Sequence, residues 1–393
     1  MSRSSFLPAP RRTAQRLAAA LLAGAIVAGS AVAGSAVAGS AAPAGATTVP
    51  SVSRLQGVSC PSTTFCMAVG QGHDVVSSTS TTNAILEYRS GAWSTAELAS
   101  SPDTTWQTVS CSSSSWCVAA GVTSGNLVAV AYYNGAWTIF PGVTTKYQSF
   151  AYAMQVSCSG TLCMIAGYSN TAVMKVHNAS LTQERFPTPT GDTFQSEGVW
   201  CGSATLCRLT GYAMSSAGDK SVEFEWNGTS WATWPPKVSS GLLGAPLGCS
   251  AAAFCVTWNV DETTNHMSVE TYAGAAWTAS SVAYTGHESG TEPTGFSCVG
   301  STFCLQAGFF YNSGFTAFLP MAYVLKGTTW SLSTLPSLGK FAYLTSGTCA
   351  STTDCYAVGM STKSTTVNGA KWTPVLLHYT GTSWASVAVA GLS

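Results

Sequence analysis

Residues 58–70 read VSCPSTTFCMAVG, and six variants of this stretch follow along the chain. The second copy, residues 109–121, reads VSCSSSSWCVAAG, and the last, residues 347–359, reads GTCASTTDCYAVG. The first cysteine of each copy lies 43 to 51 residues after that of the preceding copy. A repeat of about 40 to 50 residues with strand-like content is typical of β-propeller blades, so the repeat predicts that fold class.

Each unit continues with a second pattern of an apolar strand, a glycine turn and a tryptophan. In the first unit, residues 84–88 (AILEY) lead to Gly91 and Trp93. The third unit departs from the pattern, with Asn178 in the turn and Leu181 in place of the tryptophan. The unit therefore predicts four strands, called a to d. Strand a ends at the first cysteine, strand b runs from the second cysteine to the glycine, and strands c and d form a hairpin.

Seven complete units span about residues 54–393 and leave almost nothing over. The predicted fold is an all-β, seven-bladed β-propeller with four antiparallel strands in each blade. No surplus strand has to cross between the first and the last blade to close the ring. An exchange of one strand between these two blades remains an alternative.

The two cysteines of each unit flank the turn between strands a and b. On adjacent antiparallel strands they would lie opposite each other, about 4.5–5.5 Å apart at Cα, which suits a disulfide. Metal ligation is the weaker alternative, because metal sites favour two to four intervening residues and neighbouring blades keep the pairs apart. The prediction is one disulfide within each blade: Cys60–Cys66, Cys111–Cys117, Cys158–Cys163, Cys201–Cys207, Cys249–Cys255, Cys298–Cys304 and Cys349–Cys355.

Composition limits the classes of partner. Sixteen Lys and Arg residues balance sixteen Asp and Glu residues, and charged residues make up only 8% of the chain. There is no basic excess to follow a phosphate backbone, so nucleic-acid binding is not expected. The hydrophobic content of 46% is ample for a core.

The N-terminal segment, residues 1–46, has the features of a secretory signal peptide. Four arginines precede an apolar run from Leu17 through Ala38, and small residues suited to cleavage end the segment at Ala44-Gly45-Ala46. The apolar run is long enough to remain as an uncleaved anchor, which is the alternative. Residues 47–53 are then a short linker. We expect a secreted or cell-surface protein with no further contact with the membrane.

The order of these signals resembles the kelch and galactose-oxidase-like propellers. A closer resemblance is to secreted actinobacterial repeat proteins with Ser-Cys-x5-Cys-x-Ala-Val-Gly units, as in residues 59–70, and it covers about residues 54–393. It implies the propeller fold but no activity, because one fold serves many functions. Copper oxidase chemistry is not expected, since it needs an unpaired cysteine and every cysteine here has a partner.

A site is expected on the face that carries the b–c and d–a loops, because function concentrates in variable loops on a rigid scaffold. Two loops of the fifth unit bring acids and histidines to one sector of this face. Oxygen ligands there would suit calcium, although solvated loop charges are the simpler interpretation, and no other cofactor is expected. The candidate metal-binding residues are Asp261, Glu262, His266, His287, Glu288 and Glu292. Residues 309–311 (FFY), in a loop of the sixth unit, are a further candidate as a platform for stacking a sugar, although packing under the loop is the simpler interpretation.

The favoured function is a secreted, monomeric, non-catalytic binding module for an extracellular glycan or protein. No catalytic residue is identified, and an enzyme is the less favoured alternative. That enzyme would be an exported glycan hydrolase or lyase with its site at the channel mouth, which would require a pair of carboxylates at glycosidase spacing. A structural protein of the cell surface is the remaining alternative.

Overall fold

A computed structural model gives the structure of the chain. The residues that it describes are 51–73, 81–96, 104–123, 126–140, 153–167, 172–178, 180–187, 193–214, 220–234, 242–243, 246–260, 267–280, 291–311, 318–365 and 370–389. All regular structure in these ranges is β-strand, and no helix there could span a bilayer.

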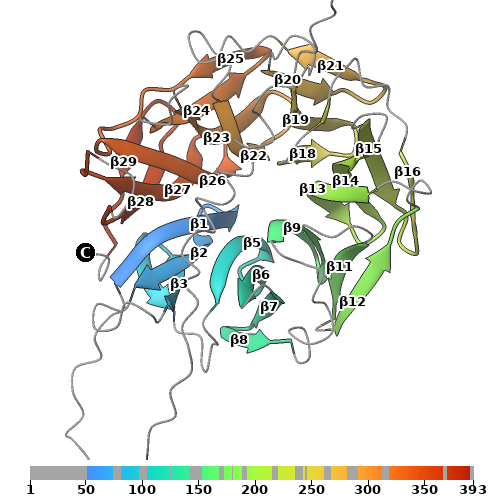
Figure 1. Ribbon diagram of the computed structural model, residues 1–393, viewed down its shortest axis with the longest axis horizontal. Helices are drawn as coiled ribbons and strands as arrows, with labels where there is room; N and C mark the ends of the chain where they lie inside the picture. The colour runs from blue at the N-terminus through green and yellow to red at the C-terminus, as the bar shows by residue number, and fades with distance from the viewer. Residues whose placement is uncertain are drawn as a thin grey trace, which may run out of the picture. The chain divides into compact units, whose positions relative to one another are not determined.

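The strands form seven antiparallel sheets arranged radially around a central axis (Figure 1). Each sheet comes from one continuous stretch of chain and is one blade, so the predicted seven-bladed, four-stranded architecture is confirmed. In blade 5, two short strands share the inner position, because both β17 and β18 pair with β19.

The strands of blades 1 to 3 are β1 (Ser51–Ser62), β2 (Phe65–His73), β3 (Thr81–Arg89), β4 (Ala92–Ala96), β5 (Thr105–Ser113), β6 (Trp116–Thr123), β7 (Asn126–Tyr133), β8 (Ala136–Ile139), β9 (Ala153–Ser159), β10 (Leu162–Gly167), β11 (Ala172–His177) and β12 (Ser180–Arg185). Those of blades 4 and 5 are β13 (Thr193–Ser203), β14 (Leu206–Met214), β15 (Lys220–Trp226), β16 (Trp231–Thr233), β17 (Leu242–Leu243), β18 (Gly248–Ala251), β19 (Phe254–Val260), β20 (Met267–Tyr272) and β21 (Trp277–Ser280). Those of blades 6 and 7 are β22 (Thr291–Cys298), β23 (Phe303–Tyr311), β24 (Phe318–Lys326), β25 (Thr329–Leu332), β26 (Phe341–Ser351), β27 (Asp354–Thr362), β28 (Thr373–Tyr379) and β29 (Trp384–Ser386).

All seven predicted disulfides are present, one in each blade, and no cysteine among the described residues is free. The bonded cysteines lie opposite each other on strands a and b, as Cys111 and Cys117 do. Their Cα atoms are 4.0–4.1 Å apart, somewhat closer than predicted. Each bridge links the two innermost strands of one blade and does not join neighbouring blades.

Among the described strands, β10 of blade 3 ends at the repeat glycine, Gly167, as predicted, but in other blades strand b continues past the glycine and the prediction is wrong. Strand β2 continues past Gly70 to His73, and β27 continues past Gly359 to Thr362. The glycine lies instead beside a β-bulge in strand a, where a carbonyl group of strand a comes too close for any side chain. The glycines in this position with such a close approach are Gly70, Gly121, Gly211, Gly308 and Gly359.

The serine before the first cysteine joins neighbouring blades. The hydroxyl of Ser59 accepts a hydrogen bond from the Cys111 N–H of the next blade at 2.9 Å, and Ser110 does the same for Cys158 at 3.0 Å. The pattern recurs between blades 3 and 4, between 6 and 7, and between 7 and 1. These N–H groups belong to the innermost strand, which has no further strand to pair with, so the serines satisfy them from the neighbouring blade.

Replacing Ser110 with alanine is expected to lower the free energy of unfolding by about 1 kcal/mol, because the Cys158 N–H loses its acceptor. Chemical denaturation of the oxidised protein would measure the loss. The control is Ser115→Ala in the exposed a–b turn of the same blade, which should change stability by less than about 0.5 kcal/mol. Equal effects of the two substitutions would contradict this role for Ser110.

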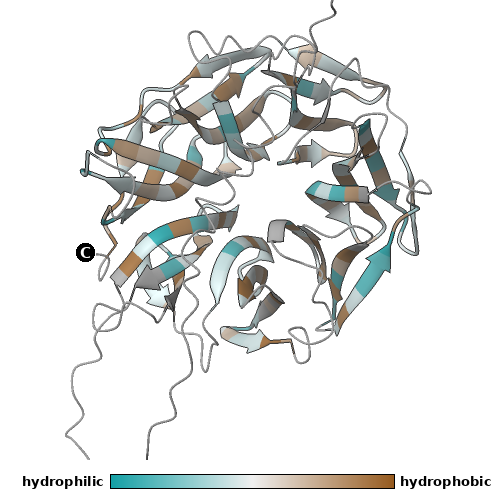
Figure 2. Ribbon diagram, in the orientation of Figure 1, coloured by the Kyte–Doolittle hydropathy of each residue, from teal (hydrophilic) through white to brown (hydrophobic). Residues whose placement is uncertain are grey.

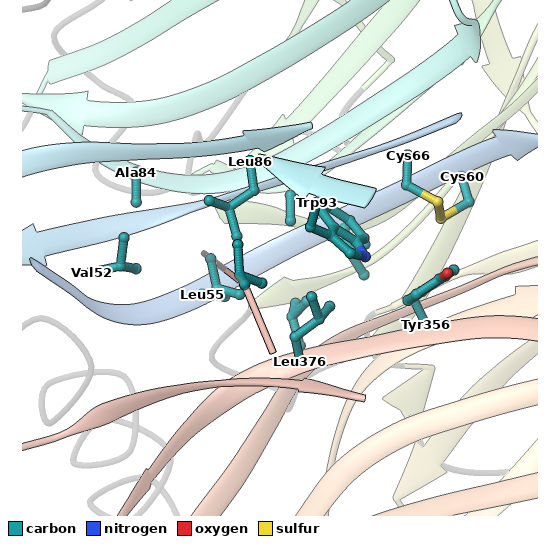
Figure 3. Packing of buried hydrophobic residues seen from close by; sticks show 13 residues of the cluster. Val52, Leu55, Cys60, Cys66, Ala84, Leu86, Trp93, Tyr356 and Leu376 are labelled. Atoms are coloured by element: carbon teal, nitrogen blue, oxygen red, sulfur yellow. A yellow bond between two sulfur atoms is a disulfide. The ribbon is translucent and has the colours of Figure 1, made fainter. Parts of the chain in front are cut away.

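The ring closes without exchange of a strand. Blade 7 takes all four of its strands, β26 to β29, from the C-terminal part of the chain. Blades 1 and 7 meet through a packed apolar cluster in which Trp93 lies against Tyr356, with ring centroids 5.5 Å apart (Figure 3). The Thr345 hydroxyl also donates to the Leu55 carbonyl across this junction at 2.8 Å. Side chains therefore join the first and last blades.

Each pair of neighbouring blades encloses its own apolar cluster. Tyrosines and tryptophans of the repeat lie in these clusters. Tyr132, for example, packs on Trp137 of its own blade and on Phe65 of the blade before it. Apolar segments recur along the strands of all the blades (Figure 2), and β6 and β10 are buried at nearly every position, which fits sheets that pack on both faces.

Candidate functional site

Most of the predicted metal cluster lies outside the described residues, namely Asp261, Glu262, His266, His287 and Glu288. The remaining member, Glu292, is a half-buried residue of β22 that pairs with Phe309. Within the described ranges, no group of three or more His, Cys, Asp or Glu side chains could hold a metal. The predicted cluster therefore stays a prediction.

The suggested sugar platform at residues 309–311 is not a loop. Strand β23 includes these residues, and Phe309 and Phe310 are buried. Phe309 packs edge-on against Tyr343 of blade 7 at 4.9 Å, and Phe310 packs against Tyr323 of its own blade. These two aromatic side chains belong to the core, and they are not available to stack on a sugar.

A surface cleft lies at the outer side of blades 6 and 7 and has a volume of about 480 Å³. One wall is formed by β24, β25 and the segment of residues 333–336 that follows them; the other is formed by the c–d turn of blade 7. Tyr379 and Trp384 also border the cleft, but they are only 3% and 7% exposed and belong to the apolar core between blades 6 and 7. A second cavity of about 290 Å³ lies along the same segment, so Leu332 and Leu335 line both.

The walls of the cleft offer hydrogen-bonding groups. Hydroxyl groups of Thr334, Thr382 and Ser383 line it from exposed residues. Lys326 donates from Nζ to the Gly381 carbonyl at 3.0 Å, and the Tyr379 hydroxyl donates to the same carbonyl at 2.5 Å. These two hydrogen bonds hold the c–d turn of blade 7 in place. The cleft therefore combines exposed apolar surface at Leu332 with polar groups on a fixed turn, as small-molecule sites commonly do.

Blades 4 and 5 meet differently from the other blades, because their interface contains buried carboxylates. Glu223 of β15 is 6% exposed and Glu270 of β20 is fully buried. Burial raises the pKa of Glu223 to about 8. Arg208 of β14 is buried in the same interface, where it lies 3.8 Å from the centroid of Trp234 and pairs with Glu225 at 3.3 Å.

Both features escaped the sequence interpretation. The cleft depends on the path of residues 333–336, which no motif marks. The carboxylates carry a signal that an alignment of the seven units would show. At the position of Glu223 in the repeat, the other blades have Ile85, Ala129, Val173, Val269, Ala322 and Leu376.

Comparison with known proteins agrees with the fold. No family model and no curated protein matches the sequence. Among solved structures, the chain is similar to the β-propeller domain of the Trilobed protease from Pyrococcus furiosus, described as having an open velcro topology. The TM-score is 0.56 at 8% identity, over 86% of this chain and 98% of that one.

Two further structures are similar at this level. YCF48 from Cyanidioschyzon merolae matches with a TM-score of 0.51 and 12% identity, over 84% of this chain and 96% of that one. The Pyrococcus horikoshii acylaminoacyl peptidase matches with a TM-score of 0.54 and 8% identity, over 85% of this chain and 52% of that one. At such low identity, these similarities describe the fold and carry no ligand or activity.

Proposed function

We propose that this protein is an exported, non-catalytic binding module that holds an extracellular glycan in the cleft between blades 6 and 7. The observation that carries the proposal is the combination, in one cleft, of the exposed apolar side chain of Leu332 with serine and threonine hydroxyls. Sugar rings have apolar faces and hydroxyl edges, so they match both parts of such a cleft. A protein segment with an aromatic or apolar side chain is the alternative ligand.

Export is supported by the disulfides. Seven bridges in one chain are typical of an oxidising compartment, because cytosolic thiols are kept reduced. The signal peptide at residues 1–46 and the linker predicted at 47–53 complete this proposal, with the difference that β1 already begins at Ser51. The resemblance to kelch propellers and secreted actinobacterial repeat proteins is part of it as well.

A glycan hydrolase or lyase is less favoured on the described residues. Such an enzyme needs two carboxylates that reach the substrate. Glu223 and Glu270 share one interface, but both are buried between blades 4 and 5 and cannot contact a polysaccharide. A purely structural role would leave the cleft without a function.

The test is a glycan array probed with the oxidised protein, followed by an assay for released sugar. We expect binding without release, and at least about a tenfold loss of affinity in Thr382→Trp, because the indole fills the cleft from an exposed position. The control is Thr229→Trp, at the equivalent position in the c–d turn of blade 4. An array without binding would overturn the glycan ligand, and released sugar would overturn the non-catalytic role.

A further inference from the structure

The interface between blades 4 and 5 departs from the repeat at two facing positions. Glu223 replaces the apolar residues given above. Glu270 of the facing blade replaces Leu86, Val130, Met174, Phe224, Tyr323 and Leu377. At the interfaces 7–1, 2–3, 3–4, 5–6 and 6–7, the two equivalent side chains lie in one packed apolar cluster. The same geometry therefore brings the two carboxylates into one layer between blades 4 and 5.

Other oxygen atoms gather in this layer. Thr210 is opposite Glu223 across the β14–β15 ladder, and Thr257 is opposite Glu270 across the β19–β20 ladder. Asn259 donates from Nδ2 to Glu270 Oε1 at 2.9 Å. The donor set consists of carboxylate, hydroxyl and amide oxygens, which is the set that hard divalent cations prefer.

Two of these oxygens have no hydrogen-bond partner among the described residues. They are Oε1 of Glu223 and Oγ1 of Thr210, and Thr210 is fully buried. Leaving a buried hydroxyl or carboxylate oxygen unsatisfied is costly, so a native protein normally supplies a partner. The Thr210 hydroxyl is not an acid, so its missing partner cannot be explained by the protonation of a carboxylate. It is therefore a second, independent indication that another group is bound here.

The Arg208 guanidinium, which lies on this face of β14, already interacts with other side chains. Arg208, two residues before Thr210, pairs with Glu225 and stacks on Trp234. It also lies over Tyr272 of blade 5, with the guanidinium carbon 4.9 Å from the ring centroid. Arg208 is thus held among aromatic rings in the part of the interface beside the disulfide of blade 5, where it donates to Cys255 Sγ.

Blade 5 is also altered where it approaches these carboxylates. Asn259 occupies the position that is glycine in the other blades, and the inner strand is interrupted between β17 and β18. The interruption places the Pro246 carbonyl where it accepts a hydrogen bond from the Thr257 hydroxyl at 3.1 Å. The backbone of blade 5 therefore adds carbonyl oxygen to an interface that is apolar elsewhere in the ring.

We propose that blades 4 and 5 bind a hard divalent cation, Ca²⁺, between Glu223 and Glu270, with the Thr210 hydroxyl as a further ligand. Ca²⁺ accepts mixed carboxylate and neutral oxygen ligands in irregular geometry, whereas Mg²⁺ demands a near-ideal octahedron and Zn²⁺ favours nitrogen and sulfur. The bound ion neutralises the two carboxylates and joins the two blades at the layer where the other interfaces have apolar side chains. This inference does not depend on the glycan proposal.

The experiment is calorimetric titration of Ca²⁺ into the full oxidised protein after treatment with a chelator, together with thermal unfolding. We expect one strong site per chain and a rise in melting temperature with Ca²⁺. Glu223→Gln and Glu270→Gln should each weaken this site at least about tenfold and remove most of the thermal shift. Terbium luminescence excited through tryptophan gives a second readout, because Trp234 lies in the same interface.

Two controls separate this site from others. Glu184→Gln removes a carboxylate that pairs with Lys175 on blade 3, and it should leave Ca²⁺ binding unchanged. Asp261→Ala combined with Glu288→Ala tests the loop cluster, and it should also leave this site intact. The proposal is overturned if the wild type binds no Ca²⁺ up to about 10 mM, above the range of weak extracellular sites. It is equally overturned if Glu223→Gln binds Ca²⁺ as tightly as the wild type.

Discussion

Gly359→Ala is expected to lower the free energy of unfolding by about 3 kcal/mol, the upper end of the cost of overpacking. A Cβ atom at Gly359 would overlap the Tyr343 carbonyl oxygen and lie 3.0 Å from Leu344 Cα. Both atoms belong to the backbone of the inner strand, so no rotation of a side chain can relieve the overlap. Either strand β26 must move away from β27 or the bulge must be lost. Chemical denaturation of the oxidised protein would measure the effect.

A glycine in open space provides the matched control. Gly91 has a φ of +106° in the c–d turn of blade 1, and a Cβ atom there would meet nothing within 4 Å. Gly91→Ala should therefore cost only the backbone strain of a left-handed residue, about 1 kcal/mol. Similar losses for the two variants would show that close approach to strand a is not the reason for glycine at position 359.

The repeat was enough to predict the blades because it carries the physical requirements of each sheet. A cysteine pair can bond only across two adjacent strands, and the turn glycines with positive φ, such as Gly228 and Gly381, mark where strands c and d reverse. No pattern in the sequence predicted the β-bulge in strand a. The glycine opposite the bulge is the one residue that it requires, and in the sequence this glycine looks the same as a glycine that ends a strand.

The site residues were harder to predict. Periodicity identifies which positions face a neighbouring blade, but a glutamate at such a position, like Glu223, reads as an ordinary polar residue unless the seven units are aligned. The cleft between blades 6 and 7 has a different cause. It depends on how residues 333–336 pass along β24, with the Ser333 N–H donating to the Ala322 carbonyl, and tertiary packing sets that path.

The departures from the repeat gather in one sector. Trp200 of blade 4 and Gly248 of blade 5 stand where serine or threonine joins the other blades, so two junctions lack that hydrogen bond. Gln155 of blade 3 compensates in part. Its amide donates to the Leu247 carbonyl and accepts from the Leu247 and Val199 N–H groups, and so it joins blades 3, 4 and 5. Several features of the repeat are thus missing from the same part of the ring. Such combined departures are typical of functional or strained regions.

In a buffer free of divalent cations, the protein is expected to lose stability as pH rises from about 5 to about 8. Burial raises the pKa of Glu223 from its ordinary 4.5 to about 8, so the folded state keeps a proton that the unfolded state has released. Stability from this group is complete below pH 4.5 and falls as pH rises through 8. The full loss is on the order of 5 kcal/mol, because each tenfold change in proton affinity between the folded and unfolded states corresponds to about 1.4 kcal/mol.

Glu223→Gln should abolish this pH dependence, because an amide has the shape of the protonated acid and does not ionise. The variant should be more stable than the wild type at pH 8 and similar to it at pH 5, as measured by denaturant unfolding at several pH values in the presence of a chelator. Glu184→Gln, which removes a carboxylate paired with Lys175, should keep the slope of the wild type. If the glutamine variant keeps that slope as well, a group other than Glu223 carries the proton. If instead added Ca²⁺ flattens the wild-type curve and leaves the Glu223→Gln curve unchanged, then a proton and a cation alternate in neutralising one carboxylate. That alternation would explain how the packed interface between blades 4 and 5 tolerates a buried acid.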